Sequence, residues 1–389
     1  MLQGDNGKGK SPMKKILIVN DLITGGGVEK LLQDFVERWH DEYDVTVMSL
    51  FNERDFYEYY PENVHYVFKT ARRSYNSTFS IAYLIYTIKR IICKLRFDHI
   101  KKHGNFDVVI ALKDGDVTQY CADFNCPRKF SWYHTDYNNY YYSEYLYGSA
   151  ENEFNELKKY NKVVCVSQDI KDSLVNVLGD TGNYVVKYNP LNVEKIMYGG
   201  NEPVIDVKKV EGRPLFVEVG RINYQKGYDL LLEAVHMLEA EGYDFDVIAI
   251  GGQENWGDEY NRVNRAAKRL KIKNVRFLGL RANPYKYMKM ADWLLSTSIF
   301  EGFSLVSQEA ALLDTPLLLT DCSGVRELIG DNEYGIVMEP SVLGIYKGMK
   351  KVLDNPELQK YYKEKIIERK KIIDQDLRFK EIEDMLFGE

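Results

Sequence analysis

Two glutamates eight residues apart, Glu301 and Glu309, are the strongest candidates for chemistry in this 389-residue chain. Glu301 comes just before a predicted helix and Glu309 lies inside it, where it suits the paired hydroxyls of a ribose. The residues between them open the helix, where a glycine permits close backbone approach and N–H groups bind phosphate: Gly302, Phe303, Ser304 and Leu305. The alternative is a helix cap with two exposed glutamates.

Two cations flank a loop that directly follows the predicted strand 215–219. They are Arg221 and Lys226, in the run GRINYQKG. Fixed cations at the carboxyl end of a strand suit a diphosphate, whose negative charge grows on the leaving group as a bond breaks. Arg grips such a group with a planar fork, while Lys acts as a point charge. The alternative is a pair of ordinary solvated loop charges.

The amino-terminal half offers a glycine turn and one histidine as candidate ligand contacts. Gly25, Gly26 and Gly27 follow the first predicted strand and would let a phosphate or sugar approach the backbone. A tight turn is the alternative, and no G-x-G-x-x-G fingerprint occurs. His134 follows another predicted strand, where it could contact a sugar hydroxyl or transfer a proton, or be structural.

Short apolar runs alternate with helical spacing along the chain, which predicts parallel strands buried on both faces. The pattern is typical of two doubly wound α/β domains, whose ligands bind at the carboxyl ends of the strands. The predicted strands are residues 15–20, 45–49, 64–67, 108–112, 129–132, 163–166, 184–188, 215–219, 245–250, 275–278, 293–296, 317–320 and 336–339.

Composition excludes several classes of protein. The net charge of −6 argues against a nucleic-acid partner, and no run of apolar residues is long enough for a transmembrane helix. The five cysteines are odd in number and lack C-x-x-C spacing, which argues against a disulfide framework or a structural zinc site and favours the cytoplasm. The D-x-D pattern matches three times in this chain, which makes it uninformative as evidence for a metal site.

Together, these motifs resemble the retaining glycosyltransferases of family 4, which have the GT-B fold. The resemblance covers nearly the whole chain from Met13. Glu301 and Glu309 look like the E-x7-E pair of that family, and Arg221 and Lys226 look like its diphosphate grip. The glycine turn and His134 fall where the family has its glycine loop and a sugar-contacting histidine.

The chain departs from the family pattern at two positions. Asp314 stands where the family usually has glycine at a helix end, and aspartate tolerates left-handed backbone geometry. Thr297 precedes Ser298 where Pro-Ser is common. We expect neither departure to touch the proposed chemistry.

The resemblance implies a GT-B fold, with two doubly wound Rossmann-like domains facing a central cleft. After a disordered leader or tag at residues 1–12, residues 13–190 would form the acceptor-side domain. Residues 191–370 would form the nucleotide-sugar-binding domain, after a linker in 189–212. Residues 371–389 would form a carboxy-terminal helix that packs back on the first domain.

The resemblance also implies roles for the candidate residues. Arg221 and Lys226 would stabilise the departing diphosphate, Glu309 would hold the ribose, and Glu301 and the backbone after it would hold the donor sugar. His134 would contact that sugar from the other domain. A nucleotide-sugar, UDP-sugar by preference, would be a substrate, with no cofactor and no essential metal.

Residues 72–103 form a basic segment that suits an anionic membrane surface. The segment holds eight Lys or Arg residues and one acidic residue, Asp98. A helical wheel gives one apolar stripe and an opposite, aromatic and basic side. The stripe comprises Ile81, Leu84, Ile85, Ile88, Ile91, Ile92 and Leu95, and the opposite side comprises Phe79, Tyr83, Tyr86, Arg90, Lys94, Phe97 and Lys101. Such interleaving favours docking at a membrane interface. The alternative is a domain helix whose outer aromatic residues touch neighbouring loops.

These features predict a cytoplasmic transferase at the inner face of the cell membrane. It would retain anomeric configuration while moving a sugar to a glycan or lipid-linked acceptor for cell-surface polysaccharide. Two alternatives stay open. One is a nucleotide-sugar epimerase of the same fold, which product analysis would distinguish. The other is a non-catalytic nucleotide-sugar-binding protein, against which the intact charged motifs argue.

Overall fold

The structure of the protein is a computed structural model. It describes residues 13–21, 26–50, 61–68, 95–252, 259–370 and 374–388. The predicted leader, Gly25 and most of the basic segment lie outside the described residues.

The predicted strands are confirmed, with bounds that shift by no more than two residues. They lie in a seven-stranded and a six-stranded sheet among the described residues. The strands are β1 Lys15–Asn20, β2 Asp44–Ser49, β3 His65–Phe68, β4 Val108–Ala111, β5 Arg128–Tyr133, β6 Lys162–Cys165, β7 Tyr184–Val186, β8 Leu215–Val219, β9 Asp246–Ile250, β10 Val275–Gly279, β11 Trp293–Ser296, β12 Leu317–Thr320 and β13 Ile336–Met338.

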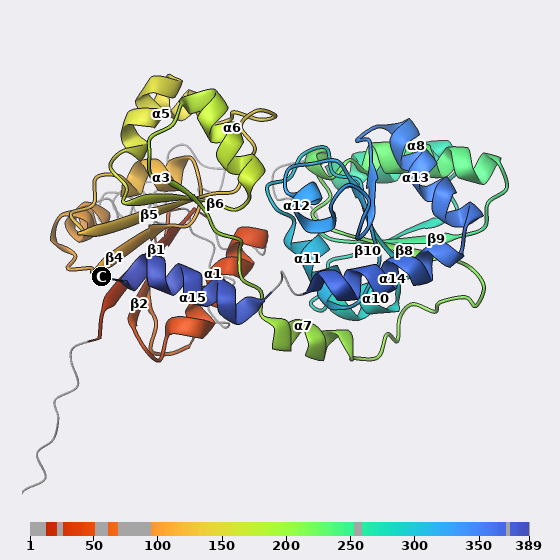
Figure 1. The fold of residues 1–389 in the computed structure, drawn as a ribbon, viewed down its shortest axis with the longest axis horizontal. Helices are drawn as coiled ribbons and strands as arrows, with labels where there is room; N and C mark the ends of the chain where they lie inside the picture. The colour runs from red at the N-terminus through yellow and green to blue at the C-terminus, as the bar shows by residue number, and fades with distance from the viewer. Residues whose placement is uncertain are drawn as a thin grey trace, which may run out of the picture. The chain divides into compact units, whose positions relative to one another are not determined.

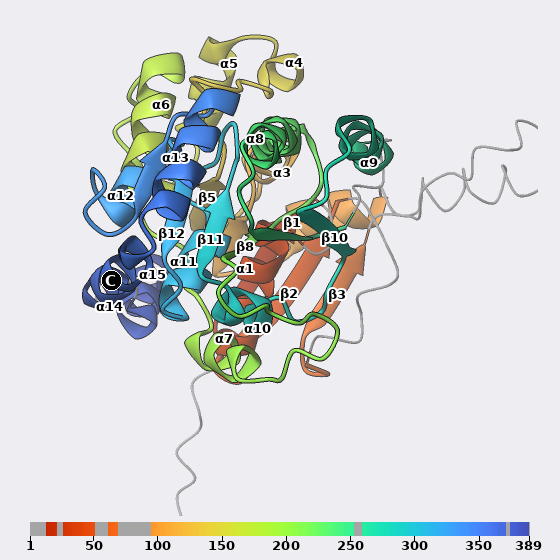
Figure 2. The same ribbon diagram turned by 90° about the vertical axis from the view of Figure 1, so that its right-hand side faces the viewer.

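Both sheets have doubly wound topology. The first has the order β3-β2-β1-β4-β5-β6-β7, and the second has the order β10-β9-β8-β11-β12-β13. In the first, β1 pairs in parallel with β2 and β4, and Figure 2 shows β1, β2 and β3 side by side. In the second, β8 pairs in parallel with β9 and β11. The strand order reverses at β1/β4 and at β8/β11, and such switch points are where these sheets bind ligands.

Helices connect the strands. Their described bounds are α1 Gly27–Trp39, α3 Asp116–Cys121, α4 Glu144–Tyr147, α5 Ala150–Leu157, α6 Gln168–Leu178, α7 Val193–Gly200, the 3₁₀ turn η2 Tyr224–Lys226, α8 Tyr228–Ala240, α9 Glu259–Leu270, α10 Tyr285–Met290, α11 Leu305–Leu312, α12 Val325–Ile329, α13 Val342–Asp354, α14 Glu357–Arg369 and α15 Gln375–Phe387.

The six-stranded sheet is covered on both faces. Figure 1 shows α8 and α13 on one side of it and α10 and α14 on the other. Phe216 of β8 and Trp293 of β11 pack with Leu232 and Val235 of α8 and Met349 of α13 in one buried cluster. Because burial of such side chains is the main force that stabilises a fold, this packing fixes the strand ends on which the loops depend.

The predicted linker contains a helix that the sequence pattern does not reveal. Helix α7 ends at Gly199 and Gly200, although a glycine pair is typical of a loop. A Cβ on Gly199 would overlap the ring of Tyr285, and one on Gly200 would overlap Leu313. The two glycines therefore serve close packing of α7 against its neighbours.

The helical-wheel assignment is wrong at the described end of the basic segment. Residues 95–103 are helical, but Leu95 is exposed and Phe97 is buried. The ring of Phe97 lies 5.9 Å from that of Tyr120, so packing against α3 turns this aromatic side chain inward.

Backbone contacts divide the chain into two compact units. One comprises residues 1–132 and 146–163, and the other comprises residues 133–145 and 164–389. The loop that carries His134 therefore belongs to the same unit as the six-stranded sheet. The domain limits expected from the sequence stay a prediction.

Candidate active site

The loops after β8 and β11 meet at the switch point of the six-stranded sheet. Within the β8 loop, Asn223 caps η2 by accepting a hydrogen bond from the Lys226 amide at 3.3 Å. Gly227 follows with φ of 65°, and a Cβ there would overlap the carbonyl oxygen of Thr297. The amide of Ile299 donates to the carbonyl of Gln225 at 2.8 Å. The two loops are therefore joined backbone to backbone.

An ion pair joins a predicted cation to a predicted carboxylate across these loops. Lys226 Nζ contacts Glu301 Oε1, although the two residues lie 75 positions apart in the sequence. Ser298 Oγ donates to the same carboxylate oxygen at 2.7 Å. The side chains of Lys226 and Glu301 are only 16% and 12% exposed, so water screens their charges weakly. Arg221, on the same loop, is exposed.

Glu309 lies inside α11, as the spacing predicts. Ser304 is the N-cap of this helix, and its hydroxyl accepts a hydrogen bond from the Ser307 amide at 3.3 Å. Leu305 is the first helical residue, and Glu309 is buried in the next turn. Phe303 is also buried, with its ring 5.0 Å from that of Tyr188. A ligand at this helix end would therefore meet the main chain of Phe303 and not its side chain.

Gly302 permits a close approach, but the partner is the protein itself. A Cβ on Gly302 would overlap the carbonyl oxygen of His134, and Ser167 Oγ donates to the Gly302 carbonyl at 3.1 Å. The main chain of His134 thus lies directly against the residue that follows Glu301. The His134 side chain is half-buried.

Two further contacts hold the loop of His134 beside the strand ends. Ser323 Oγ donates to Asp136 Oδ2 at 2.6 Å. The rings of Tyr140 and Phe300 lie 5.6 Å apart. The structure therefore brings His134, Gly302 and Glu301 into one region, although their sequence positions are far apart.

The glycine turn is described only in part. Gly26 is the N-cap of α1, and its N–H donates to Glu29 Oε2 at 2.7 Å. Gly27 opens the helix. Because Gly26 and Gly27 belong to the other compact unit, their use in a ligand site stays a prediction.

Sequence reasoning missed the part that Thr297 and Glu218 play. Thr297 Oγ1 lies 2.9 Å from Glu218 Oε1 and 2.9 Å from the Lys226 carbonyl. The Thr297 hydroxyl thus contacts the main chain of the candidate cation, and the expectation that Thr297 does not touch the proposed chemistry stays a prediction. Burial raises the pKa of Glu218 to about 8, opposed by hydrogen bonding to Thr297 and the charge of Lys226. An acidic residue inside an apolar strand was the only available signal.

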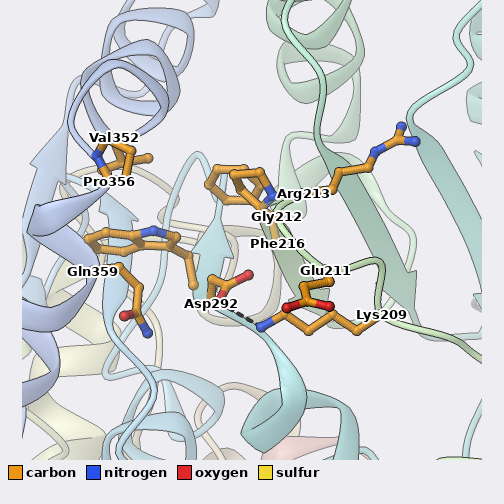
Figure 3. Close-up of a pocket in the computed structure, with 11 residues that line it drawn as sticks. Lys209, Glu211, Gly212, Arg213, Phe216, Asp292, Val352, Pro356 and Gln359 are labelled. Carbon is orange, nitrogen blue, oxygen red and sulfur yellow. Dashed lines mark hydrogen bonds and ion pairs between the residues drawn. The ribbon is translucent and has the colours of Figure 1, made fainter.

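A second feature of the sheet lies at the opposite strand ends. A hollow of about 530 Å³ opens at the amino ends of β8 and β11, and Figure 3 shows Lys209, Arg213 and Asp292 around it. Lys209 Nζ donates to Asp292 Oδ1 at 2.6 Å. None of the candidate residues lines this hollow. We assign the candidate site to the carboxyl ends because parallel sheets bind ligands there.

Two further kinds of feature are absent from the described ranges. These ranges contain no group of three or more His, Cys, Asp or Glu residues that could hold a metal ion. None of their helices is long and apolar enough to cross a membrane. The absence of a metal and of a cofactor from the reaction stays a prediction.

Two family models match the chain in series. The model described as Glycosyltransferase Family 4 matches residues 25–195, and Glycosyl transferases group 1 matches residues 204–369. Among curated relatives, a Campylobacter jejuni protein is 31% identical over 192 residues, 49% of each chain. It is named N-acetylgalactosamine-N,N'-diacetylbacillosaminyl-diphospho-undecaprenol 4-alpha-N-acetylgalactosaminyltransferase. The alpha-D-kanosaminyltransferase of Streptomyces kanamyceticus is 26% identical over 39% of each chain. The chain thus spans about half the length, or less, of these relatives.

Solved structures share the fold over nearly the full length. Anabaena HepE in complex with UDP-glucose has a TM-score of 0.75 at 16% identity, over 96% of this chain and 99% of that one. The sucrose-phosphate synthase of Thermosynechococcus elongatus has a TM-score of 0.71 at 16% identity, with the same coverage. At such identity the likeness shows the fold alone, which is the GT-B fold of two parallel-stranded Rossmann-like sheets.

Proposed function

Because this chain belongs to the glycosyltransferases of the GT-B type, we propose that it transfers a sugar from a nucleotide-sugar donor to a glycan or lipid-linked acceptor. The observation that carries the proposal is the Lys226–Glu301 ion pair at the β8/β11 switch point, with Glu309 in the helix that follows. A cation and a carboxylate beside a helix N-terminus suit a diphosphate and the sugar attached to it.

Each candidate group has a role in this reaction. Arg221 and Lys226 neutralise the departing diphosphate, and the amides that open α11 bind its oxygens. Glu309 accepts hydrogen bonds from the ribose hydroxyls. Glu301 holds the donor sugar, and His134 contacts that sugar from the adjacent loop. When the diphosphate binds, it competes with Glu301 for the charge of Lys226.

The finer assignments rest on similarity. HepE, which shares the fold, is solved with UDP-glucose, which supports UDP-sugar as the donor. The name of the Campylobacter jejuni relative contains a diphospho-undecaprenol, which supports a lipid-linked acceptor. A role in cell-surface polysaccharide synthesis is part of the proposal. Retention of anomeric configuration and independence from metal follow from the resemblance to family 4.

A lipid-linked acceptor would be reached at a membrane, so we assign the basic segment 72–103 to an anionic surface on the cytoplasmic side. Lys and Arg side chains near such a surface contribute about 1 kcal/mol each. Flotation with vesicles of anionic lipid at low salt tests this assignment. Equal recovery with neutral and anionic vesicles would refute it.

Purified protein should first be screened against UDP-, GDP- and ADP-sugars by thermal shift, because a ligand that binds the native state raises its melting temperature. The stabilising donor is then incubated with lipid-linked acceptors, with and without EDTA. NMR of the product reports the linkage. We expect UDP-sugars to stabilise the protein and the product to keep the donor's anomeric configuration in EDTA.

The outcomes separate the rival functions. An epimerised sugar nucleotide without acceptor consumption would indicate an epimerase. Donor binding without product, over a broad acceptor panel, would indicate a binding protein. An inverted product or loss of transfer in EDTA would refute the retaining, metal-independent assignment while leaving a transferase.

A further inference from the structure

Glu218 is a carboxyl group in the middle of the six-stranded sheet. It lies in β8 between two valines, and only 2% of its surface is exposed. β8 lies between β9 and β11, so both edges of the strand are shielded from water. A carboxylate is costly to bury without full hydrogen bonding. Among the described residues, no group hydrogen-bonds to Glu218 Oε2.

The hydrogen bonds of the Thr297 hydroxyl distinguish the ionised from the protonated form of Glu218. Thr297 Oγ1 lies 2.9 Å from Glu218 Oε1 and 2.9 Å from the Lys226 carbonyl oxygen. A hydroxyl has one proton to donate, and the Lys226 carbonyl can only accept. If Glu218 is ionised, two acceptors share one proton. If Glu218 carries a proton, it donates to Thr297, which donates to Lys226, and both bonds are made.

Among the described residues, titratable groups that act on Glu218 include Lys226 and Glu301, and burial outweighs them. Lys226 and hydrogen bonding by the Thr297 main chain favour the ionised form, Glu301 disfavours it, and the fully buried Tyr228 senses the charge of Glu218. Burial is the largest effect and raises the pKa of Glu218 to about 8. Burial and the hydrogen-bond geometry therefore both favour the protonated form of Glu218.

The two hydrogen bonds connect Glu218, through the Thr297 hydroxyl, to the main-chain carbonyl of Lys226, whose side chain is the candidate cation. We propose that Glu218 is a positioning residue that, in its protonated form, donates a hydrogen bond to the Thr297 hydroxyl and thereby fixes the main chain of Lys226 for transfer. This inference rests on the proposed function, because it uses Lys226 as the diphosphate partner. Thr297 holds the loop twice, since its carbonyl also packs against Gly227.

The first test needs no substrate. In the unfolded chain Glu218 ionises near its ordinary pKa of 4.5, while in the folded protein it ionises near 8. Between these values the unfolded state has lost the proton and the folded state keeps it, so stability falls as the pH rises. Denaturation of the wild type and of Glu218→Gln should therefore diverge. We expect the unfolding constant of the wild type, divided by that of Glu218→Gln, to rise about tenfold per pH unit between pH 5 and 8 and then to level off.

The second test follows transfer. The side-chain amide that Glu218→Gln introduces can donate to Thr297 without titrating, so this variant should keep transfer within about twofold at pH 7. Wild-type kcat/KM for the donor should fall at least about threefold between pH 7 and 9, while that of Glu218→Gln stays level. Thr297→Val should reduce transfer at both pH values, and Thr297→Ser should restore it. The same profile for free-donor hydrolysis controls for titration of the acceptor.

Each of the following outcomes would support or overturn the proposed role of Glu218. A constant stability difference across pH 5 to 8 would overturn the neutral Glu218, whatever the transfer assay gives. A folded Glu218→Gln protein that is inactive at pH 7 would show that the carboxylate is needed in its charged form. If Glu218→Gln fails to fold, Glu218→Met must show the same pH-dependent divergence in stability and match Thr297→Val in transfer. Absence of transfer by the wild type would refute the proposed function and leave the stability test standing.

Discussion

The two ends of β8 and β11 each hold a lysine paired with a carboxylate. At the carboxyl ends Lys226 pairs with Glu301, with side chains 16% and 12% exposed. At the amino ends Lys209 pairs with Asp292, with side chains 36% and 24% exposed. The large hollow lies beside the second pair, and the more shielded charges lie at the first. Strand direction and charge shielding therefore both favour the carboxyl ends for the candidate site, although the hollow lies at the amino ends.

Glycines at the carboxyl ends of the strands are packed more tightly than the glycine at the amino ends. At the carboxyl ends, a Cβ on Gly227 or Gly251 would overlap a backbone carbonyl oxygen of the facing loop. At the amino ends, Gly212 has nothing within 4 Å of the added atom, although its φ is 76°. The carboxyl-end loops are packed backbone to backbone, whereas the amino-end loop is held by side-chain contacts such as those of Lys209 with Asp292 and of Arg213 with the Phe245 carbonyl.

The largest expected effect is on stability and compares Gly227→Ala with Gly212→Ala. Both substitutions place an L side chain at positive φ, which costs about 1 kcal/mol. Only Gly227→Ala also drives a methyl group into the Thr297 carbonyl, so we expect a total loss of about 3 kcal/mol. Urea denaturation measures both variants. Equal losses would show that backbone packing does not distinguish the two strand ends.

The next effect is on transfer and compares the two lysines. Lys226→Ala should reduce kcat/KM at least tenfold, or about 1.4 kcal/mol in the barrier, because the leaving diphosphate loses a fixed charge. Lys209→Ala removes the same kind of ion pair and should leave transfer within about twofold. Steady-state kinetics with the donor varied measures both. Equal reductions would show that neither ion pair marks the site.

Much of this arrangement could be predicted from the sequence because buried parallel strands appear as unbroken apolar runs. The bounds of β8 and β11 match the predicted ranges, and the charged motifs at their carboxyl ends follow from those bounds. Asp314 is predicted to accept left-handed geometry, and its φ is 61°. Local sequence patterns can therefore predict where strands end and which single residues adopt an unusual backbone conformation.

The missed features depend on contacts between distant segments. Gly302 makes room for the carbonyl of His134, a contact that local spacing does not reveal, while its use by a ligand stays a prediction. Periodicity places Phe97 outward, but it packs against Tyr120. The sequence around Glu218 does not reveal its hydrogen-bond partner, because Thr297 lies 79 positions away. Local patterns do not encode which neighbour fills a given space.

A smaller effect is expected at Ser298, whose hydroxyl orients Glu301. Ser298→Ala removes the 2.7 Å hydrogen bond to Glu301 Oε1 and leaves the Lys226 pair in place. Loss of one hydrogen bond to a carboxylate of this kind should cost about 1 kcal/mol, which is roughly a fivefold fall in kcat/KM. Ser341→Ala is the control, because Ser341 caps α13 and should change stability without changing transfer. Transfer that is unchanged in Ser298→Ala would show that Glu301 needs no such support.

The smallest effect concerns the stability that the Lys209–Asp292 pair provides. This pair is partly exposed, so Lys209→Ala should cost no more than about 0.5 kcal/mol, and less in 1 M salt, where charges are screened within about 3 Å. Asp292 also accepts a hydrogen bond from the Leu215 amide at 2.9 Å. Asp292→Ala should therefore cost about 1 kcal/mol more, and that part should persist in salt because a hydrogen bond at the start of β8 is lost. Denaturation at low and high salt separates the two contributions. A salt-insensitive loss in Lys209→Ala would mean that the amino-end charges are as shielded as those at the carboxyl ends.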